Sequence, residues 1–269
     1  MNPNLWQYLR EDKKKIHGWL QRVDAEIMGA IFEAQAEQAI NGSCVEIGVH
    51  HGKSFIPLCM ALKNNEQALC IDVFDEQGKN KDASGKGNRD VFLKNLAWLN
   101  IAFDEANIIQ ASSEDVTPSQ ITEKVGEVRF FNIDGGHWSS IVQNDLRLAE
   151  ATLAEGGVIA LDDYCRAEWP DVTYGYSLWQ AATESDVIPF AIGSNKLFLC
   201  RKAYAQHYQK ALKTPFLRHY FAKRYTSEIA KIDCYRTEPY NQDEESDKKM
   251  QRAMLKIFRP DKFIAFLKG

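Results

Sequence analysis

Two segments of the sequence carry the residues best suited to chemistry. Asp134 and His137 lie in RFFNIDGGHW, and Asp162 and Asp163 lie in GGVIALDDY. Each segment contains a short apolar run that is typical of a buried strand. The carboxyl ends of neighbouring parallel strands meet at one edge of a sheet, so we expect these four side chains close together. Like charges at short range disfavour joint ionisation, so the carboxylates require protons or a cation among them.

A hard divalent cation is the simplest partner for three such carboxylates. Mg²⁺ or Mn²⁺, with Ca²⁺ less favoured, prefers oxygen ligands and leaves positions open for substrate hydroxyls. Coordination lowers the pKa of a hydroxyl, and the imidazole of His137 can accept its proton. Plainer alternatives stay open: His137 only hydrogen-bonds its loop, and Asp162 and Asp163 only cap a helix and face solvent.

The segment VEIGVHHGKS predicts a turn from a strand to a helix at which a ligand can bind. Gly48 and Gly52 allow close approach of the backbone, and the amides that open the next helix can receive a carboxylate or a phosphate. A phosphate-binding P-loop has four residues between its glycines, whereas GVHHGKS has three. This difference argues against a nucleoside triphosphatase.

Polar side chains also end the next two predicted strands. Asp72 follows the apolar start of CIDVF, where its carboxylate can accept hydrogen bonds from both hydroxyls of a ribose. Ser112 and Ser113, in QASSEDV, offer short polar groups to an adenine edge. Because these features follow one another on successive strands, we expect the ligand to contain a nucleoside.

The adjacent histidines His50 and His51 lie inside the first turn. Neighbouring residues on a turn rarely aim both rings at one ion, and no cysteine is close in sequence, so zinc is not expected here. We interpret the pair as contacts to cofactor or substrate.

The elements that position these residues alternate between short apolar runs and amphipathic stretches, as βα units on a parallel sheet do. The pattern is helical from Leu5 to Ala39, and Asn41-Gly42 ends it. Strands are predicted at Cys44–Val49, Ala68–Val73, Asn107–Ala111, Val128–Ile133 and Val158–Leu161. Helices are predicted at Ser54–Lys63, Arg89–Leu99, Pro118–Lys124, Ser140–Leu153 and around Ser177–Thr183.

Two further apolar runs, Val187–Ile192 and Lys196–Arg201, are separated only by a short turn, which permits a hairpin. Five parallel strands closed by an antiparallel hairpin differ from a dehydrogenase sheet and favour a methyltransferase. The predicted fold class is therefore α/β, a doubly wound, Rossmann-like methyltransferase sheet. Residues 1–40 are expected to form an N-terminal helical segment, 41–203 the cofactor-binding domain and 204–269 a helical C-terminal appendage.

The composition sets outer limits on function. The chain has 269 residues, of which 45% are hydrophobic and 26% charged, and its formal net charge is −4. These values suit one large core and give no overall attraction to nucleic acid or to anionic lipid. No apolar run approaches the roughly 20 residues of a membrane span and no signal peptide is evident, so we expect a cytoplasmic protein. Its six scattered cysteines are typical of buried thiols.

The motifs VEIGVHHGKS, CIDVF, NIDGGH and GGVIALDDY together resemble class I S-adenosylmethionine methyltransferases, especially macrolide-sugar O-methyltransferases, over about residues 40–201. The resemblance implies that Asp134, Asp162 and Asp163 bind Mg²⁺ and that His137 is the base. It also implies S-adenosylmethionine as cofactor. Together with the residues read above, the expected cofactor contacts are Glu46, Gly48, Gly52, Ser54, Asp72, Ser112, Ser113 and Asp134. The first motif departs from GxGxG, so contacts of His50 and His51 do not carry over.

Three hypotheses for function follow. The first is metal-assisted methylation of a hydroxyl on a small molecule, such as a sugar or a glycan-linked precursor. The second keeps the fold and cofactor without metal, with Asp162 and Asp163 contacting the substrate. The third is a non-catalytic nucleoside-binding module. The charged loop from Phe74 to Asn88 suits a lid over bound cofactor, although an inert surface loop is the alternative. The oligomeric state stays open, and a homo-oligomer is one option.

Overall fold

Five short apolar strands form the parallel half of one sheet in the computed structural model, which describes residues 4–182 and 184–238. They run in the order β3-β2-β1-β4-β5, and all neighbouring pairs among them are parallel. Their bounds are β1 (Ser43–Ile47), β2 (Ala68–Ile71), β3 (Ile108–Ile109), β4 (Val128–Ile133) and β5 (Leu153–Leu161). All five coincide with predicted strands, although β3 is shorter and β5 begins earlier than expected.

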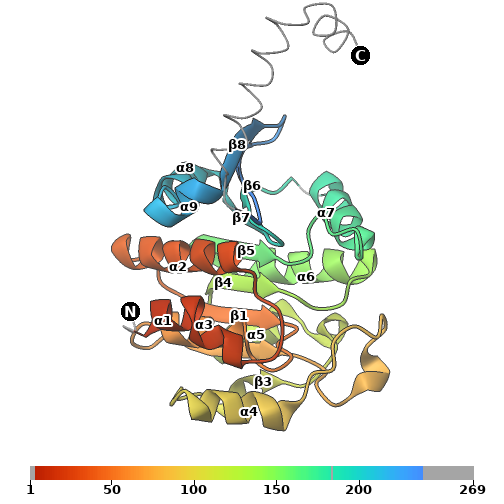
Figure 1. Cartoon of the computed structure of the whole chain (residues 1–269). Helices are drawn as coiled ribbons and strands as arrows, with labels where there is room; N and C mark the ends of the chain where they lie inside the picture. The colour runs from red at the N-terminus through yellow and green to blue at the C-terminus, as the bar shows by residue number, and fades with distance from the viewer. Residues whose placement is uncertain (1–3, 183, 239–269) are drawn as a thin grey trace, which may run out of the picture. The chain divides into compact units, whose positions relative to one another are not determined.

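The predicted hairpin closes this half of the sheet. Strands β6 (Val187–Ile192) and β7 (Leu197–Arg201) are antiparallel, and β7 lies between β5 and β6 (Figure 1). The Gly193 amide donates to the carbonyl of Lys196 (2.9 Å) across the turn. The hairpin places that turn next to the end of β5, where Asp162 and Asp163 follow.

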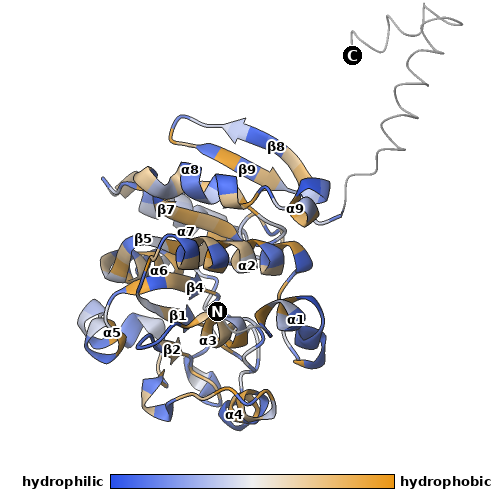
Figure 2. Cartoon of the chain, turned by 90° about the vertical axis from the view of Figure 1, so that its left-hand side faces the viewer, coloured by the Kyte–Doolittle hydropathy of each residue, from blue (hydrophilic) through white to orange (hydrophobic). Residues whose placement is uncertain are grey.

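The C-terminal segment was predicted to be helical, but its described part contains two strands as well as two helices. After α8 (Lys202–Ala211) and α9 (Pro215–Tyr220), β8 (Phe221–Thr226) and β9 (Lys231–Tyr235) extend the sheet in the order β6-β9-β8. Every residue of β8 is exposed, so its basic and aromatic sequence shows no buried period by which a strand is recognised. In Figure 2, β7 is largely hydrophobic, whereas much of β8 is hydrophilic. The rest of the predicted appendage, from residue 239, lies outside the described residues.

The two faces of the sheet are covered by different helices. In β4, Phe130 packs on Phe32 of α2 (Arg22–Glu37) with ring centroids 4.8 Å apart, whereas Phe131 belongs to the core formed with Leu146. The first core also includes residues of α3 (Phe55–Ala61) and α4 (Arg89–Trp98). The second includes residues of α5 (Pro118–Val125), α6 (Ser139–Thr152) and α7 (Pro170–Ala182). Alternate side chains of buried strands thus serve opposite faces, as in a doubly wound fold.

The N-terminal region forms two helices where one helical pattern was predicted. After α1 (Leu5–Arg10) comes a short 3-10 helix, η1 (Asp12–Lys15), and α2 begins only at Arg22. Gly18 lies in this break with φ of +132°, a conformation that side-chain-bearing residues rarely adopt. The break brings Trp19 and Gln21 to the cavity described below.

Residues up to Thr237 belong to one compact unit, and the division into residues 1–40, 41–203 and 204–269 stays a prediction. The observed α7 begins before the predicted Ser177, and Thr183 lies outside the described residues. No helix in the described parts of the chain is long and apolar enough to cross a membrane.

Candidate active site

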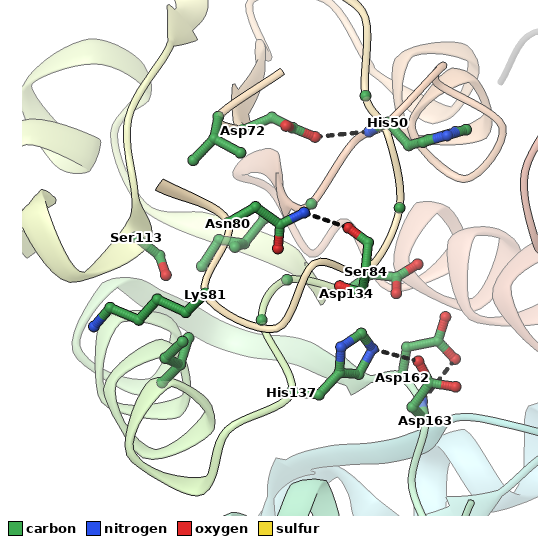
Figure 3. A pocket seen from close by; sticks show the side chains of 18 of the residues that line it. His50, Asp72, Asn80, Lys81, Ser84, Ser113, Asp134, His137, Asp162 and Asp163 are labelled. Atoms are coloured by element: carbon green, nitrogen blue, oxygen red, sulfur yellow. Dashed lines mark hydrogen bonds and ion pairs between the residues drawn. The ribbon is translucent and has the colours of Figure 1, made fainter. Parts of the chain in front are cut away.

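A cavity of about 320 Å³ opens at the carboxyl ends of the parallel strands. Loops after β1, β2, β4 and β5 line it, together with the loop around residues 77–87 and the break before α2. The predicted site residues that line it are Gly48, Asp72, Ser112, Ser113, Asp134, His137, Asp162 and Asp163. The sheet therefore brings the nucleoside features and the acidic cluster to one space, which Figure 3 shows from close by.

The turn after β1 depends on Gly48. Its φ is +80°, and a Cβ placed there would lie 1.8 Å from the carbonyl oxygen of Asp134. Asp72 shapes the same turn, because its Oδ2 accepts from the amides of Val49 (2.6 Å) and His50 (2.7 Å). Its Oδ1 accepts from the amide of Phe74 (2.6 Å). Burial raises the pKa of Asp72, and the three amides oppose that shift. Asp72 thus organises the turn and still lines the cavity.

The predicted cofactor contacts Glu46, Gly52 and Ser54 do not line the cavity. Glu46 is fully buried in β1 and accepts a hydrogen bond from Ser54 Oγ (2.5 Å). Burial raises the pKa of Glu46 to about 8, so its carboxyl holds a proton at neutral pH. A Cβ on Gly52 would lie 2.9 Å from the ring of Phe92. In this structure the three residues lie outside the cavity lining, next to the turn, and their contact with a cofactor stays a prediction.

Ser112 and Ser113 lie beyond the end of β3, at the start of a short 3-10 helix, η4 (Ser113–Asp115). The Ser112 Oγ caps this helix by accepting from the amide of Glu114 (3.4 Å). The Ser113 carbonyl accepts from Asn144 Nδ2 (3.1 Å), which ties the segment to α6. Both serines are therefore held in fixed positions at the cavity wall.

Two carboxylates hold the ring of His137. Its Nδ1 lies 2.8 Å from Asp82 Oδ2 and its Nε2 lies 2.9 Å from Asp163 Oδ2 (Figure 3). The His137 amide also donates to Asp82 Oδ2 (2.6 Å), and the ring stacks on Trp169 at 3.9 Å. Burial alone lowers the pKa of His137, but the hydrogen bonds to Asp163 and Asp82 outweigh it and raise that pKa. The ring therefore lies between two carboxylates, both of which favour its protonated form.

A lysine that the sequence analysis did not single out neutralises part of the acidic cluster. Lys196 Nζ lies 2.8 Å from Asp162 Oδ2, and both side chains are buried. Asn195 Nδ2 donates to Asp162 Oδ1 (2.7 Å) and to Asp163 Oδ1 (2.9 Å). Lys196 does not line the cavity, whereas Asn195 does. The ammonium of Lys196 thus neutralises the charge of Asp162 from the side away from the cavity, while Asp162 and Asp163 still line the cavity.

Asp134 is the acid with the least compensation. It is half-buried at the end of β4. Desolvation together with the charge of Asp162 raises its pKa well above the usual range, against the pull of Lys196. A carboxyl in this position takes a proton unless a cation approaches. The carboxylates of Asp134, Asp162 and Asp163 match a hard divalent ion in ligand type. Among the described residues, however, these three do not come close enough together to hold one ion, and Asp163 is bound to His137 and Asn195.

The loop from Phe74 to Asn88 contributes site residues that the sequence did not reveal. Asp82 contacts His137, as described, and Lys81 Nζ forms an ion pair with Glu114 Oε2 (2.6 Å). Asn88 then ends the loop as the N-cap of α4, accepting from the amide of Val91 (2.9 Å). In this structure the loop lines the cavity, and its role as a lid stays a prediction.

The strand order, the inserted antiparallel β7 and the cavity at the strand ends define the class I methyltransferase fold. Residues 45–164 match a family model described as "Methyltransferase domain". The segment 45–164 is thus similar to a methyltransferase domain, and the chain has the corresponding fold. No curated protein matches the sequence.

Two solved structures share the fold at low sequence identity. The O-methyltransferase NovP has a TM-score of 0.53 and 15% identity, covering 65% of this chain and 79% of its own. CalS11, a calicheamicin methyltransferase, has a TM-score of 0.51 and 12% identity, covering 73% and 82%. At these identities the likeness establishes the fold, and the acceptor has to be argued from the site.

Proposed function

We propose that this chain transfers a methyl group from S-adenosylmethionine to a hydroxyl of a small molecule, such as a sugar or a glycan-linked precursor. The observation that carries the proposal is one cavity lined by Gly48 and Asp72 on one side and by His137 and Asp163 on the other. The similar structures include an O-methyltransferase, which agrees with a hydroxyl acceptor. The closed turn at Gly48 and the carboxylate of Asp72 would receive the methionine and ribose parts of the cofactor, with the serines near its adenine.

The reaction would form an O–CH₃ bond and break an S–CH₃ bond, leaving S-adenosylhomocysteine. The acceptor proton needs a base, and His137 Nε2 is the candidate. Asp82 holds Nδ1 and the backbone amide of the same residue, so it fixes the tautomer with Nε2 directed away from the lid. Where Nε2 shares a proton with Asp163, that proton has to leave with Asp163 or pass to solvent, and the contact has to open, before Nε2 can accept the proton of the acceptor.

Mg²⁺ or Mn²⁺ would be held by Asp134, Asp162 and Asp163, which would have to come closer together than they lie here. When bound, the ion would lower the pKa of a coordinated acceptor hydroxyl.

A metal-independent reaction is the second candidate, and Lys196 is the observation that favours it. The buried ammonium already neutralises Asp162, and it would repel a dication.

The test combines calorimetry with turnover on a panel of sugars and other alcohols. Binding of S-adenosylhomocysteine, turnover on at least one alcohol, and loss of turnover in EDTA with recovery in Mg²⁺ would support the metal-assisted reaction. The variant Asp134→Asn should then lose both activity and the response to metal. Turnover that is insensitive to EDTA would support the second candidate. Cofactor binding with no turnover on any acceptor would contradict both and favour a binding module.

A further inference from the structure

Three histidines converge at the rim of the cavity, apart from the acidic cluster. Each of His17, His50 and His51 offers a ring nitrogen, and these nitrogens all lie within 4.8 Å of one another. The His50 and His51 rings are 3.8 Å apart, and the His17 ring lies 5.3 and 5.4 Å from them. Among the described residues, this set meets the distance that ligands of one ion require. It joins the break before α2 to the turn after β1.

The backbone at His50 explains how two adjacent rings face the same space. The φ of His50 is +53°, a left-handed conformation that is uncommon for residues other than glycine. The conformation is maintained because Asp72 accepts from the amides of both Val49 and His50. In Figure 3 the His50 ring points away from Asp72 and away from the acidic cluster. Adjacent histidines on a turn rarely aim both rings at one ion, but at this turn one ring nitrogen from each lies within 4.8 Å of the other and of His17.

The two inner rings have no competing partner at one nitrogen. The Nδ1 atoms of His50 and His51 are buried and have no hydrogen-bond partner within the described chain. Buried ring nitrogens without a partner are costly, so a ligand that takes them up is favoured. A metal ion binds the lone pair of a ring nitrogen, which a buried nitrogen without a hydrogen-bond partner can offer.

We propose that His17, His50 and His51 bind a divalent transition metal of the imidazole-preferring kind, such as Zn²⁺. Zinc bound at about 2.0–2.1 Å to each nitrogen places tetrahedral nitrogen ligands about 3.3 Å apart. Closing from 4.8 Å requires small rotations, which the exposed ring of His17 can make. Water would complete the coordination.

The site would connect metal binding to the cofactor cavity. Trp19 follows His17 by two residues, lines the cavity and lies 5.5 Å from the His50 ring. Lys53 Nζ already donates to the Gly18 carbonyl (2.7 Å), so the same segment is held once to the turn. A metal on His17 would add a second tie between this segment and the turn at Gly48. We therefore expect the ion to tighten binding of S-adenosylhomocysteine.

The test is a Co²⁺ titration of the full chain without a polyhistidine tag, in millimolar Mg²⁺ to saturate oxygen sites. One equivalent of Co²⁺ should give visible absorption bands of a low-coordinate nitrogen site, and Zn²⁺ should abolish them. The variant His17→Ala, on an exposed side chain, should weaken binding about tenfold or more. The matched control His219→Ala, also exposed, should bind as the wild type does.

Equal binding by wild type and His17→Ala would overturn the proposal, as would the absence of one stoichiometric Co²⁺. If His17→Ala weakened S-adenosylhomocysteine binding in EDTA and no Co²⁺ bound, the histidines would be cofactor contacts and the metal site would be refuted. None of these readouts requires methyl transfer, so they stay independent of the proposed activity.

Discussion

Replacing Lys196 with methionine tests the electrostatic account of the acidic cluster. The ammonium lies 2.8 Å from Asp162 Oδ2, and the two side chains are 1% and 6% exposed. Methionine keeps most of the aliphatic length and removes the charge, which leaves a buried carboxylate without its cation. Removing one partner of a buried pair costs about 3–5 kcal/mol. Because Asn195 still donates to Asp162, we expect a loss near the lower end of that range.

The free energy of unfolding is measured by urea denaturation in EDTA at pH 7.5. The control is Lys94→Met, an exposed position on α4, which should stay within about 0.5 kcal/mol of wild type. If Asp134, Asp162 and Asp163 take up a dication, Mg²⁺ should restabilise Lys196→Met more than wild type, since the repelling ammonium is gone. A loss below about 1 kcal/mol would refute the pairing argument, because it would mean that Asp162 is compensated elsewhere.

Three further predictions follow from other contacts. His137→Ala should lower turnover by about 10²-fold or more while the calorimetric affinity for S-adenosylhomocysteine changes little, and unchanged turnover would rule out its role as base. Gly48→Ala should abolish cofactor binding and destabilise the fold, because its Cβ would lie 1.8 Å from the Asp134 carbonyl oxygen; Gly78→Ala, with nothing within 4 Å, is the control, and calorimetry with thermal melting compares them. Burial raises the pKa of Asp145 from 3.8 to about 7, so the folded state retains a proton that the unfolded chain releases, and wild-type stability should fall between pH 4 and 7. Asp145→Asn should remove the Asp145 share of that slope, about 2–4 kcal/mol over this range, in denaturation at several pH values, and an unchanged slope would contradict the shift.

The sequence revealed the parts of the site that follow from strand ends. The ends of parallel strands must share one edge, so the order of Gly48, Asp72, Asp134 and the pair after β5 was enough to place them together. The alternation of apolar runs with amphipathic stretches, together with the residue types of the turns, likewise predicted the parallel strands and the hairpin. These features depend on local pattern plus one general rule of topology.

Residues whose roles come from contacts with distant parts of the chain could not be recognised from a local sequence pattern. Asp82 lies in an irregular loop and Lys196 in a tight turn, so neither has a period that assigns it to the site. Their roles arise from contacts with His137 and Asp162, which are 55 and 34 positions away in the chain. The left-handed backbone of His50 was also invisible, because a histidine is not the residue type that predicts it. Strand β8 was missed since an exposed edge strand has no buried face to set an alternation.

The contacts of Asp134, Asp162 and Asp163 determine which of them can bind a new partner. Lys196 compensates Asp162 from behind, and His137 is shared between Asp82 and Asp163 at the cavity. Only Asp134 can take up a new partner without breaking an ion pair. A hydroxyl acceptor that is to lose its proton to Nε2 must displace Asp163 from that nitrogen, and Asp163 then has to find another positive partner. The same displacement lowers the charge stabilisation of the imidazolium, so the ring becomes a competent base only when Asp163 has moved. Release of Asp163 from His137 is therefore the step on which both the metal-assisted and the metal-independent reaction depend.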